Sequence, residues 1–343
     1  MLTQLLTFIS TLNFLALAAP SAQAPWYQGG LANCDNQINN PECPTLNFAT
    51  FGDSWASGEA YSTATQYDSN KDNCHRVSHA WGRQMQDDST WTSGPRDHQF
   101  VACSGSQFHN ISDINTDEKY RQMAKLSKDI NLMTLTVGGK NIGFAGIAEA
   151  CYVKFFNQDD TACNDLSFGA IPGWLGGRQP KLSQELRRAL NGLVDAINSQ
   201  YYWAVWDVNV LDGYRHPSGS NDHYVDVSPQ FEGHRFCEPG KSKDDNYHSD
   251  DVWLWNLSTD VPQDKNNQDW PNGPGQETDK IQALIAQGGL GTFDSSGSGG
   301  SGGIGTPMFH PKEAGHTAIK DQVLNAIRGA GIAGIVKPDP PKQ

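Results

Sequence analysis

The sequence predicts an α/β protein with a largely parallel sheet sandwiched between helices. Short apolar runs alternate along the chain with segments of helical periodicity, and strands that alternate with helices usually pair in parallel. Several of the runs end directly at a glycine or at a small polar turn. Because ligands bind beyond the carboxyl ends of such strands, these turns are the place to look for a shared site.

The strands are expected where apolar and β-branched residues cluster between turns. The predicted strands are Leu46–Phe51, His98–Cys103, Asn131–Val137 and Trp203–Val210. The first runs into the turn Gly52-Asp53-Ser54, the second reaches Gly105, and the third reaches Gly138-Gly139. Ser54, Gly105 and Gly139 therefore all fall at strand ends, which is the strongest purely physical argument for one site.

The helices are expected from apolar residues that recur with helical spacing. Their predicted ranges are Ser78–Asp87, Lys119–Lys128, 182–199 and Glu313–Ile327. In the range 182–199, Leu182, Leu186, Leu190, Leu193 and Ile197 form the apolar stripe. In the last range Ile319, Val323 and Ile327 share one face, which should pack on the sheet.

The chain is expected to form one domain after a leader. The predicted parts are a signal peptide at 1–24 with cleavage between 18 and 24, an N-terminal arm at 25–45, a main domain at 46–330 and a tail at 331–343. The run from Leu5 to Ala19 is apolar but too short for a bilayer span. Residues 211–306 form a long irregular insertion that contains the Gly/Ser tract 295–305, typical of a linker or loop.

Cysteine content and charge indicate a secreted, extracellular protein. Seven cysteines without a Cys-x-x-Cys pair favour disulfides over a zinc site. Order and proximity suggest the pairs Cys34–Cys43, Cys74–Cys103 and Cys151–Cys163, with Cys237 left over or replacing one of the first pair. Asn110 and Asn256 begin glycosylation sequons. The formal net charge of −13 argues against a nucleic-acid partner.

Ser54 is the candidate nucleophile because it stands at a strand-to-helix corner, where a hydroxyl is exposed beside backbone N–H groups. The competing interpretation is an ordinary N-cap serine. A serine nucleophile needs a base, and His310 is the candidate, in a loop that enters the last helix with Pro311 at its start. His316, further along, is expected to pack or to hydrogen-bond.

Four short motifs occur along the chain in an order that is typical of a known family. Gly52-Asp53-Ser54, Cys103-Ser104-Gly105, Gly138-Gly139 with Asn141-Ile142-Gly143-Phe144, and His310-Pro311 resemble the motifs of SGNH (GDSL-type) hydrolases. The likeness is to the secreted microbial esterase and lipase branch and runs from Leu46 to Ile327. It implies a flavodoxin-like three-layer α/β/α sandwich and serine esterase chemistry without a cofactor. Ser54 would be the nucleophile and His310 the base, while the N–H groups of Ser54 and Gly105 would form the oxyanion hole with Asn141.

Two positions depart from the family pattern. Lys140 stands where an ungapped alignment places the oxyanion asparagine, so either Asn141 or the lysine donates there, or one donor is missing. Asn141 is the favoured donor. Pro307 stands where the family usually has the acid that orients the histidine. Its carbonyl could replace that acid, as in a Ser–His dyad, or Asp226 could serve, although a solvated loop aspartate is the simpler expectation. Asp53 is expected to cap the turn.

The predicted substrate is a carboxylic ester on a small molecule, a lipid or an acylated polysaccharide, and the protein is expected to be a monomer without stable membrane insertion. The rival hypothesis is an SGNH-fold protein that binds carbohydrate or lipid and has lost efficient catalysis, prompted by Lys140 and Pro307. Metal catalysis through His216, His223, His234 and His248 is disfavoured, because these residues lack the spacing of a zinc hydrolase.

Overall fold

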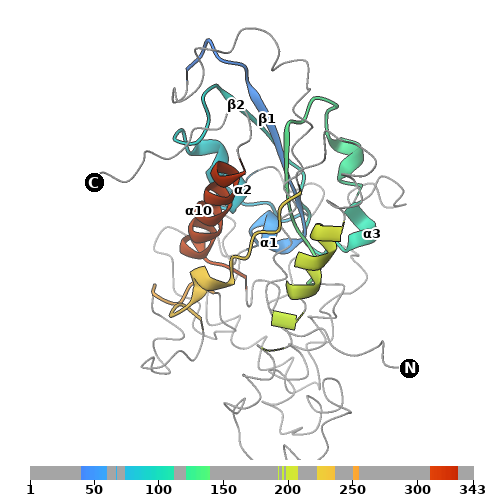
Figure 1. Ribbon diagram of the computed structural model, residues 1–343, viewed down its shortest axis with the longest axis vertical. Helices are drawn as coiled ribbons and strands as arrows, with labels where there is room; N and C mark the ends of the chain where they lie inside the picture. The colour runs from blue at the N-terminus through green and yellow to red at the C-terminus, as the bar shows by residue number, and fades with distance from the viewer. Residues whose placement is uncertain are drawn as a thin grey trace, which may run out of the picture.

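The chain has an α/β fold, as the sequence predicts. The structure, a computed structural model, describes residues 40–59, 67, 74–111, 121–139, 192, 195–196, 198–207, 222–235, 250–254 and 310–330. Within these ranges β1 (Leu46–Gly52), β2 (Arg96–Phe100) and β3 (Leu132–Thr136) form a parallel sheet in the order β2-β1-β3 (Figure 1). Among the three described strands β1 is thus the central one, with both of its edges paired.

The register of β1 and β3 sorts their side chains onto two faces. Phe48 pairs with Leu132, and both side chains are fully buried. Two residues further along, Thr50 pairs with Thr134, and the two hydroxyls lie 3.0 Å apart in the interior. Since side chains alternate along a strand, Phe51 points to the opposite face.

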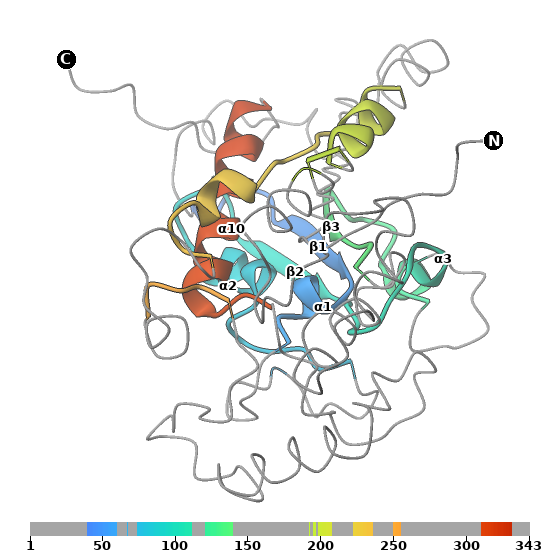
Figure 2. The same ribbon diagram turned by 90° about the horizontal axis from the view of Figure 1, so that it is seen from below.

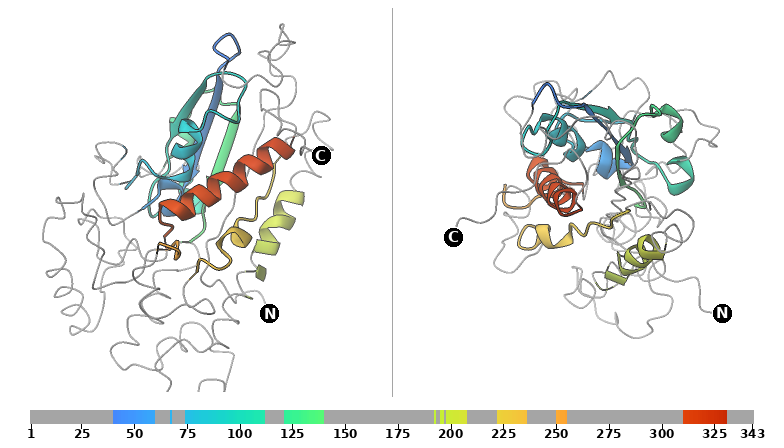
Figure 3. Two further views of the ribbon diagram at one scale, coloured as in Figure 1. Left: turned by 90° about the vertical axis from the view of Figure 1, so that its left-hand side faces the viewer. Right: turned by 45° about the horizontal axis from the view of Figure 1, so that its top comes forward.

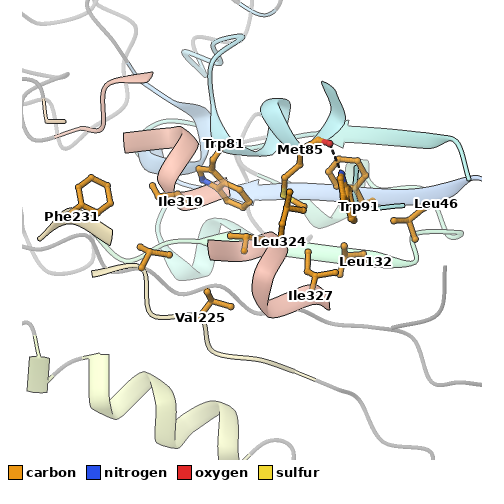
Figure 4. Close-up of a cluster of buried hydrophobic side chains, with 13 residues drawn as sticks. Leu46, Trp81, Met85, Trp91, Leu132, Val225, Phe231, Ile319, Leu324 and Ile327 are labelled. Atoms are coloured by element: carbon orange, nitrogen blue, oxygen red, sulfur yellow. Dashed lines mark hydrogen bonds between the residues drawn. The ribbon is translucent and has the colours of Figure 1, made fainter. Parts of the chain in front are cut away.

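The Phe48 face of the sheet is covered by α2 (Trp81–Asp87) and α10 (Glu313–Gly329). Figure 4 shows the apolar side chains of both helices packed over the strands, with Trp91 donating its indole N–H to the Met85 carbonyl at 2.9 Å. Ile319, Val323 and Ile327 of α10 are fully buried, which confirms the predicted apolar face. Each such side chain contributes roughly 1.5–3 kcal/mol through burial.

A smaller cluster covers the opposite face. Phe51 and Val137 pack there with Ile111 of α3 (Phe108–Ile111). Figures 2 and 3 show α2 and α10 on one side of the strands and α3 on the other. Helices therefore flank the parallel sheet on both faces.

The predicted strand Trp203–Val210 is wrong over the residues that the structure describes. Residues 198–207 are helical, with Asn198 and Val205 buried while Trp203 and Trp206 are about half exposed. Buried and exposed positions thus follow the helical period rather than alternating. The tryptophans suggested β structure, but the helical pattern that begins before them continues through them.

The predicted helix Lys119–Lys128 is also wrong. The described part contains only the short 3-10 turn Met123–Lys125. Met123 is 48% exposed, so the segment presents no apolar stripe for a helix to bury. Instead, polar side chains tie it to the sheet: Gln122 is buried against β1, and the Ser127 N–H donates to the Gln99 Oε1 at 2.8 Å.

The structure confirms the disulfide Cys74–Cys103. Cys43 is disulfide-bonded as well, and its predicted partner Cys34 lies outside the described residues, as do Cys151, Cys163 and Cys237. The predicted signal peptide, the Gly/Ser tract and the tail fall outside them too. Among the described helices, none combines the length and the apolar character that a bilayer span requires.

Candidate active site

The candidate nucleophile stands on a sharp turn at the carboxyl end of the central strand. Gly52, the last residue of β1, has φ +134°, and a Cβ there would lie 1.9 Å from the Thr136 carbonyl oxygen. Only glycine fits this position. Asp53 follows as the N-cap of α1 (Ser54–Ser57), and its carboxylate accepts the Trp55 N–H at 3.1 Å. Asp53 therefore caps the helix as predicted, and Ser54 is the first helical residue rather than the N-cap.

The loop after β2 lies directly beside this turn. The Cys103 N–H donates to the Gly52 carbonyl at 3.1 Å, and the Ser106 N–H donates to the Cys103 carbonyl at 3.1 Å. Gly105 between them has φ +82°. We call residues 103–106 the oxyanion loop, because they carry the predicted donor Gly105. The structure thus brings the chain segments of Ser54 and Gly105 together at one edge of the sheet.

The third strand end joins the same site through Asp53. The Gly139 N–H donates to the Asp53 Oδ2 at 3.3 Å, and the Asp53 N–H donates to the Thr136 carbonyl at 2.9 Å. Gly138 has φ +130°, which lets the chain turn back toward α1. Lys140 and Asn141 lie outside the described residues, so the choice between them stays a prediction.

Asp53 is buried, and burial raises its pKa to about 7, against the backbone N–H groups of Trp55 and Gly139, which favour its charged form. Between pH 4 and 7 the folded protein therefore holds a proton that the unfolded chain has released. A group of this kind makes the free energy of unfolding fall as pH rises, by at most about 1.4 kcal/mol per pH unit.

We expect this pH dependence of the free energy of unfolding to be lost in Asp53→Asn, because the asparagine side chain cannot titrate. Guanidinium unfolding of wild type and variant at pH 4.5, 5.5 and 6.5 should show the variant gaining relative stability with each step, because the wild type alone must release a proton. Asp97→Asn, at an exposed position of β2, is the control and should run parallel to wild type. If the difference in the free energy of unfolding between wild type and Asp53→Asn were the same at all three pH values, burial would not raise the pKa of Asp53.

His310 lies at the entrance to α10, close to the nucleophile turn. Its side chain is buried, and its ring centroid is 6.5 Å from that of Trp55, the residue after Ser54. The loop is held by the Lys312 N–H, which donates to the Trp253 carbonyl at 2.7 Å, and by a β-bridge between Pro311 and Leu254. One segment far away in the sequence thus holds the backbone of the loop that carries this ring.

His316 is a buried packing residue, whereas Asp226 is an exposed loop residue. The His316 ring is fully buried 5.4 Å from the His79 ring, and burial first of all keeps its pKa well below 6.5. It is therefore a neutral packing residue. Asp226 is exposed, and its carboxylate accepts the Ser228 N–H at 2.9 Å. It is the solvated loop aspartate of the simpler expectation. Pro307 lies outside the described residues.

A buried carboxylate missed by the sequence reasoning joins the oxyanion loop to the neighbouring segment. Glu59, only 2% exposed, accepts the Ser104 hydroxyl, and its Oε1 lies 2.9 Å from the His75 Nδ1. Burial alone would raise the pKa of Glu59, but His75, the nearby charge of His310 and the Ser104 hydroxyl together lower it to about 2. Glu59 is thus ionised throughout the physiological range.

The disulfide explains how this cluster assembles. His75 and Ser104 each follow one of the bonded cysteines, and the Ser104 N–H donates to the Cys74 carbonyl at 3.0 Å. The predicted pair Cys74–Cys103 was therefore a signal for this contact, since it brings both neighbours to the same point. His75 has φ +50°, an unusual backbone state for a residue with a side chain, found here beside the site.

Among the described residues, no three His, Cys, Asp or Glu side chains gather as metal ligands. His234 instead stacks on Trp253 with ring centroids 3.5 Å apart and pairs with Asp251 at 3.0 Å. His216 and His248 lie outside the described residues.

The chain is similar in sequence to a lipase from Streptomyces rimosus, with 24% identity over 163 residues. The match covers 48% of this chain and 51% of that protein, so the chain spans about half the length of the curated relative it matches. It supports the resemblance to microbial lipases of the SGNH type that the motifs indicate. No family model matches the chain.

Two solved structures were also matched. One is the extracellular lipase of Streptomyces rimosus, with a TM-score of 0.44, 17% identity and coverage of 83% of this chain and 99% of that one. The other is phospholipase A1 from Streptomyces albidoflavus NA297, with a TM-score of 0.41, 19% identity and coverage of 82% and 99%.

Proposed function

We propose that this protein is a secreted serine esterase or lipase that hydrolyses carboxylic esters through an acyl-enzyme. The observation that carries the proposal is the meeting of three chain segments at one edge of the sheet: the Ser54 turn, the oxyanion loop and the buried ring of His310 beside Trp55. A nucleophile, a base and backbone donors are the parts that ester hydrolysis needs.

In the proposed reaction, the Ser54 hydroxyl oxygen attacks the ester carbonyl carbon while His310 takes the hydroxyl proton. The negative charge on the carbonyl oxygen is stabilised by the N–H groups of Ser54 and Gly105, with Asn141 as the third donor. His310 then gives its proton to the departing alcohol oxygen, which leaves an acyl group on Ser54. Water, deprotonated by His310, then attacks the acyl carbon. The bond to the Ser54 oxygen breaks, that oxygen takes the proton back from His310, and the acid is released. No cofactor takes part.

The proposed substrate class follows from the ester chemistry described above and from the name of the similar Streptomyces rimosus protein. The Streptomyces rimosus protein is named a lipase, so a lipid ester is the first candidate for this chain, ahead of small soluble esters and acyl groups on polysaccharide. The disulfide Cys74–Cys103 suits an oxidising, extracellular compartment. We take the protein to act as a monomer.

The test is hydrolysis of p-nitrophenyl esters from acetate to palmitate, combined with labelling by a fluorophosphonate probe. We expect turnover on part of the series and labelling of one serine, Ser54, identified by peptide mass spectrometry. A maximum at short acyl chains would indicate an esterase, and one at long chains a lipase. Folded protein that neither turns over an ester nor takes the probe would contradict the proposal and favour the carbohydrate- or lipid-binding alternative.

A further inference from the structure

The side-chain amide of Gln122 fastens the nucleophile turn to the oxyanion loop. Gln122 is fully buried, and its Oε1 accepts the Gly52 N–H at 2.7 Å. Its Nε2 donates to the Gly52 carbonyl at 2.8 Å and to the Ser106 hydroxyl oxygen at 2.8 Å. One planar amide thus contacts both polar backbone groups of the residue that ends β1 and the residue after Gly105.

The amide takes the place of a strand that has ended. β2 ends at Phe100, and continuing its register would set Gly52 opposite residue 102. The Gly52 carbonyl still receives the Cys103 N–H at 3.1 Å, as a continued strand would provide. The Gly52 N–H, however, donates to Gln122. A side-chain amide has the same donor and acceptor as a peptide group, so it extends the ladder by one rung.

The residues that this amide contacts have little room to move. Gly52 cannot be replaced by a larger residue at φ +134°, and Ser106 is fully buried. Loss of the amide would leave the Gly52 N–H and the Ser106 hydroxyl buried without these partners, in an interior where unsatisfied polar groups are unfavourable. The expected response is a shift of the turn relative to the oxyanion loop.

We propose that Gln122 is a positioning residue for catalysis, setting the distance between the Ser54 and Gly105 N–H groups that stabilise the oxyanion. The inference rests on the ester hydrolase activity proposed above. Oxyanion donors act only when they are aimed at the developing charge, and a misplacement of about 1 Å can cost about 10²-fold in rate. Substrate binding outside this pair of donors should be little affected.

The experiment compares Gln122→Met, Ser106→Ala and the matched control Gln99→Met on p-nitrophenyl acetate, below each melting temperature. Gln99 holds the same segment through the Ser127 N–H, from a half-buried position of β2 that pairs with Ala49 and not with Gly52. We expect kcat to fall about 10²-fold in Gln122→Met and about tenfold in Ser106→Ala, with KM changed less than about threefold. Gln99→Met should lower the melting temperature and keep kcat.

The outcomes separate the two proposals. Wild type without turnover would contradict the ester hydrolase itself. Active wild type with folded Gln122→Met within about threefold of its kcat would overturn the positioning role. An equal loss of kcat in Gln99→Met would also overturn the positioning role. The loss in Gln122→Met would then come from loosening the segment that carries Gln122 and Ser127, and not from the contacts of the Gln122 amide. If Gln122→Met does not fold, the kcat of Ser106→Ala decides, since it removes only the link to the oxyanion loop.

Discussion

Replacing Ser54 by alanine is expected to abolish ester hydrolysis while leaving the fold intact. In the proposed mechanism the Ser54 hydroxyl oxygen is the atom that bonds to the acyl group. Loss of a catalytic serine typically lowers kcat by about 10⁴–10⁶-fold. Because Asp53 rather than Ser54 caps α1, the substitution removes no helix cap. The melting temperature should therefore stay close to that of wild type.

The matched control is Ser57→Ala in the same short helix. The Ser57 hydroxyl donates to the Ser54 carbonyl at 3.1 Å and is buried, so its loss should cost about 0.5–1.5 kcal/mol of stability. Its kcat should stay within about threefold of wild type. If Ser54→Ala kept more than about a hundredth of wild-type turnover and still bound the fluorophosphonate, another nucleophile would have to be sought.

The part of the fold that the sequence predicted best is the part set by local patterns. Leu46–Phe51 and Asn131–Val137 match β1 and β3 within a residue at each end, because buried parallel strands are short apolar runs between turns. The last helix was found because Ile319, Val323 and Ile327 repeat on one face. In these segments the local preference and the final packing agree.

The errors arose where tertiary contacts overrode local composition. The tryptophans at 203 and 206 favour strands by propensity, yet they lie on the outer side of a helix whose buried face includes Val205. The segment around Gln122 was predicted to be a helix, but its Gln122 side chain binds β1 and its Ser127 N–H binds the Gln99 side chain of β2. A side-chain hydrogen bond to a residue 70 positions away leaves no periodic signal in the sequence.

In the candidate site, too, local sequence patterns predicted some residues, while residues that are joined only by tertiary contacts were missed. Ser54, Gly105 and Gly139 could be grouped in advance, because the carboxyl ends of parallel strands meet at one edge. The placement of His310 beside Trp55 agrees with that grouping. For Glu59 the only signal was indirect: the predicted Cys74–Cys103 pair brings His75 and Ser104 together, but no sequence pattern shows that the Glu59 carboxylate reaches both.

Replacing His310 by alanine is expected to lower kcat by about 10³-fold or more, because Ser54 then has no base to take its proton. Fluorophosphonate labelling should slow by a similar factor, since it depends on the same activated oxygen. The buried ring leaves a cavity beside Trp55, and added imidazole should enter it and restore part of the rate. Rescue would identify the missing group as a proton acceptor rather than as a packing element.

The control for this experiment is His316→Ala, which removes a fully buried histidine from the same helix region. Its ring is kept neutral and packs against His79, so the variant should lose stability but keep kcat at temperatures where it is folded, and imidazole should not change its rate. Turnover by His310→Ala within about tenfold of wild type would mean that another residue is the base. A fall in kcat without imidazole rescue, accompanied by an equal fall in His316→Ala, would assign the effect to packing, because both rings support the start of α10.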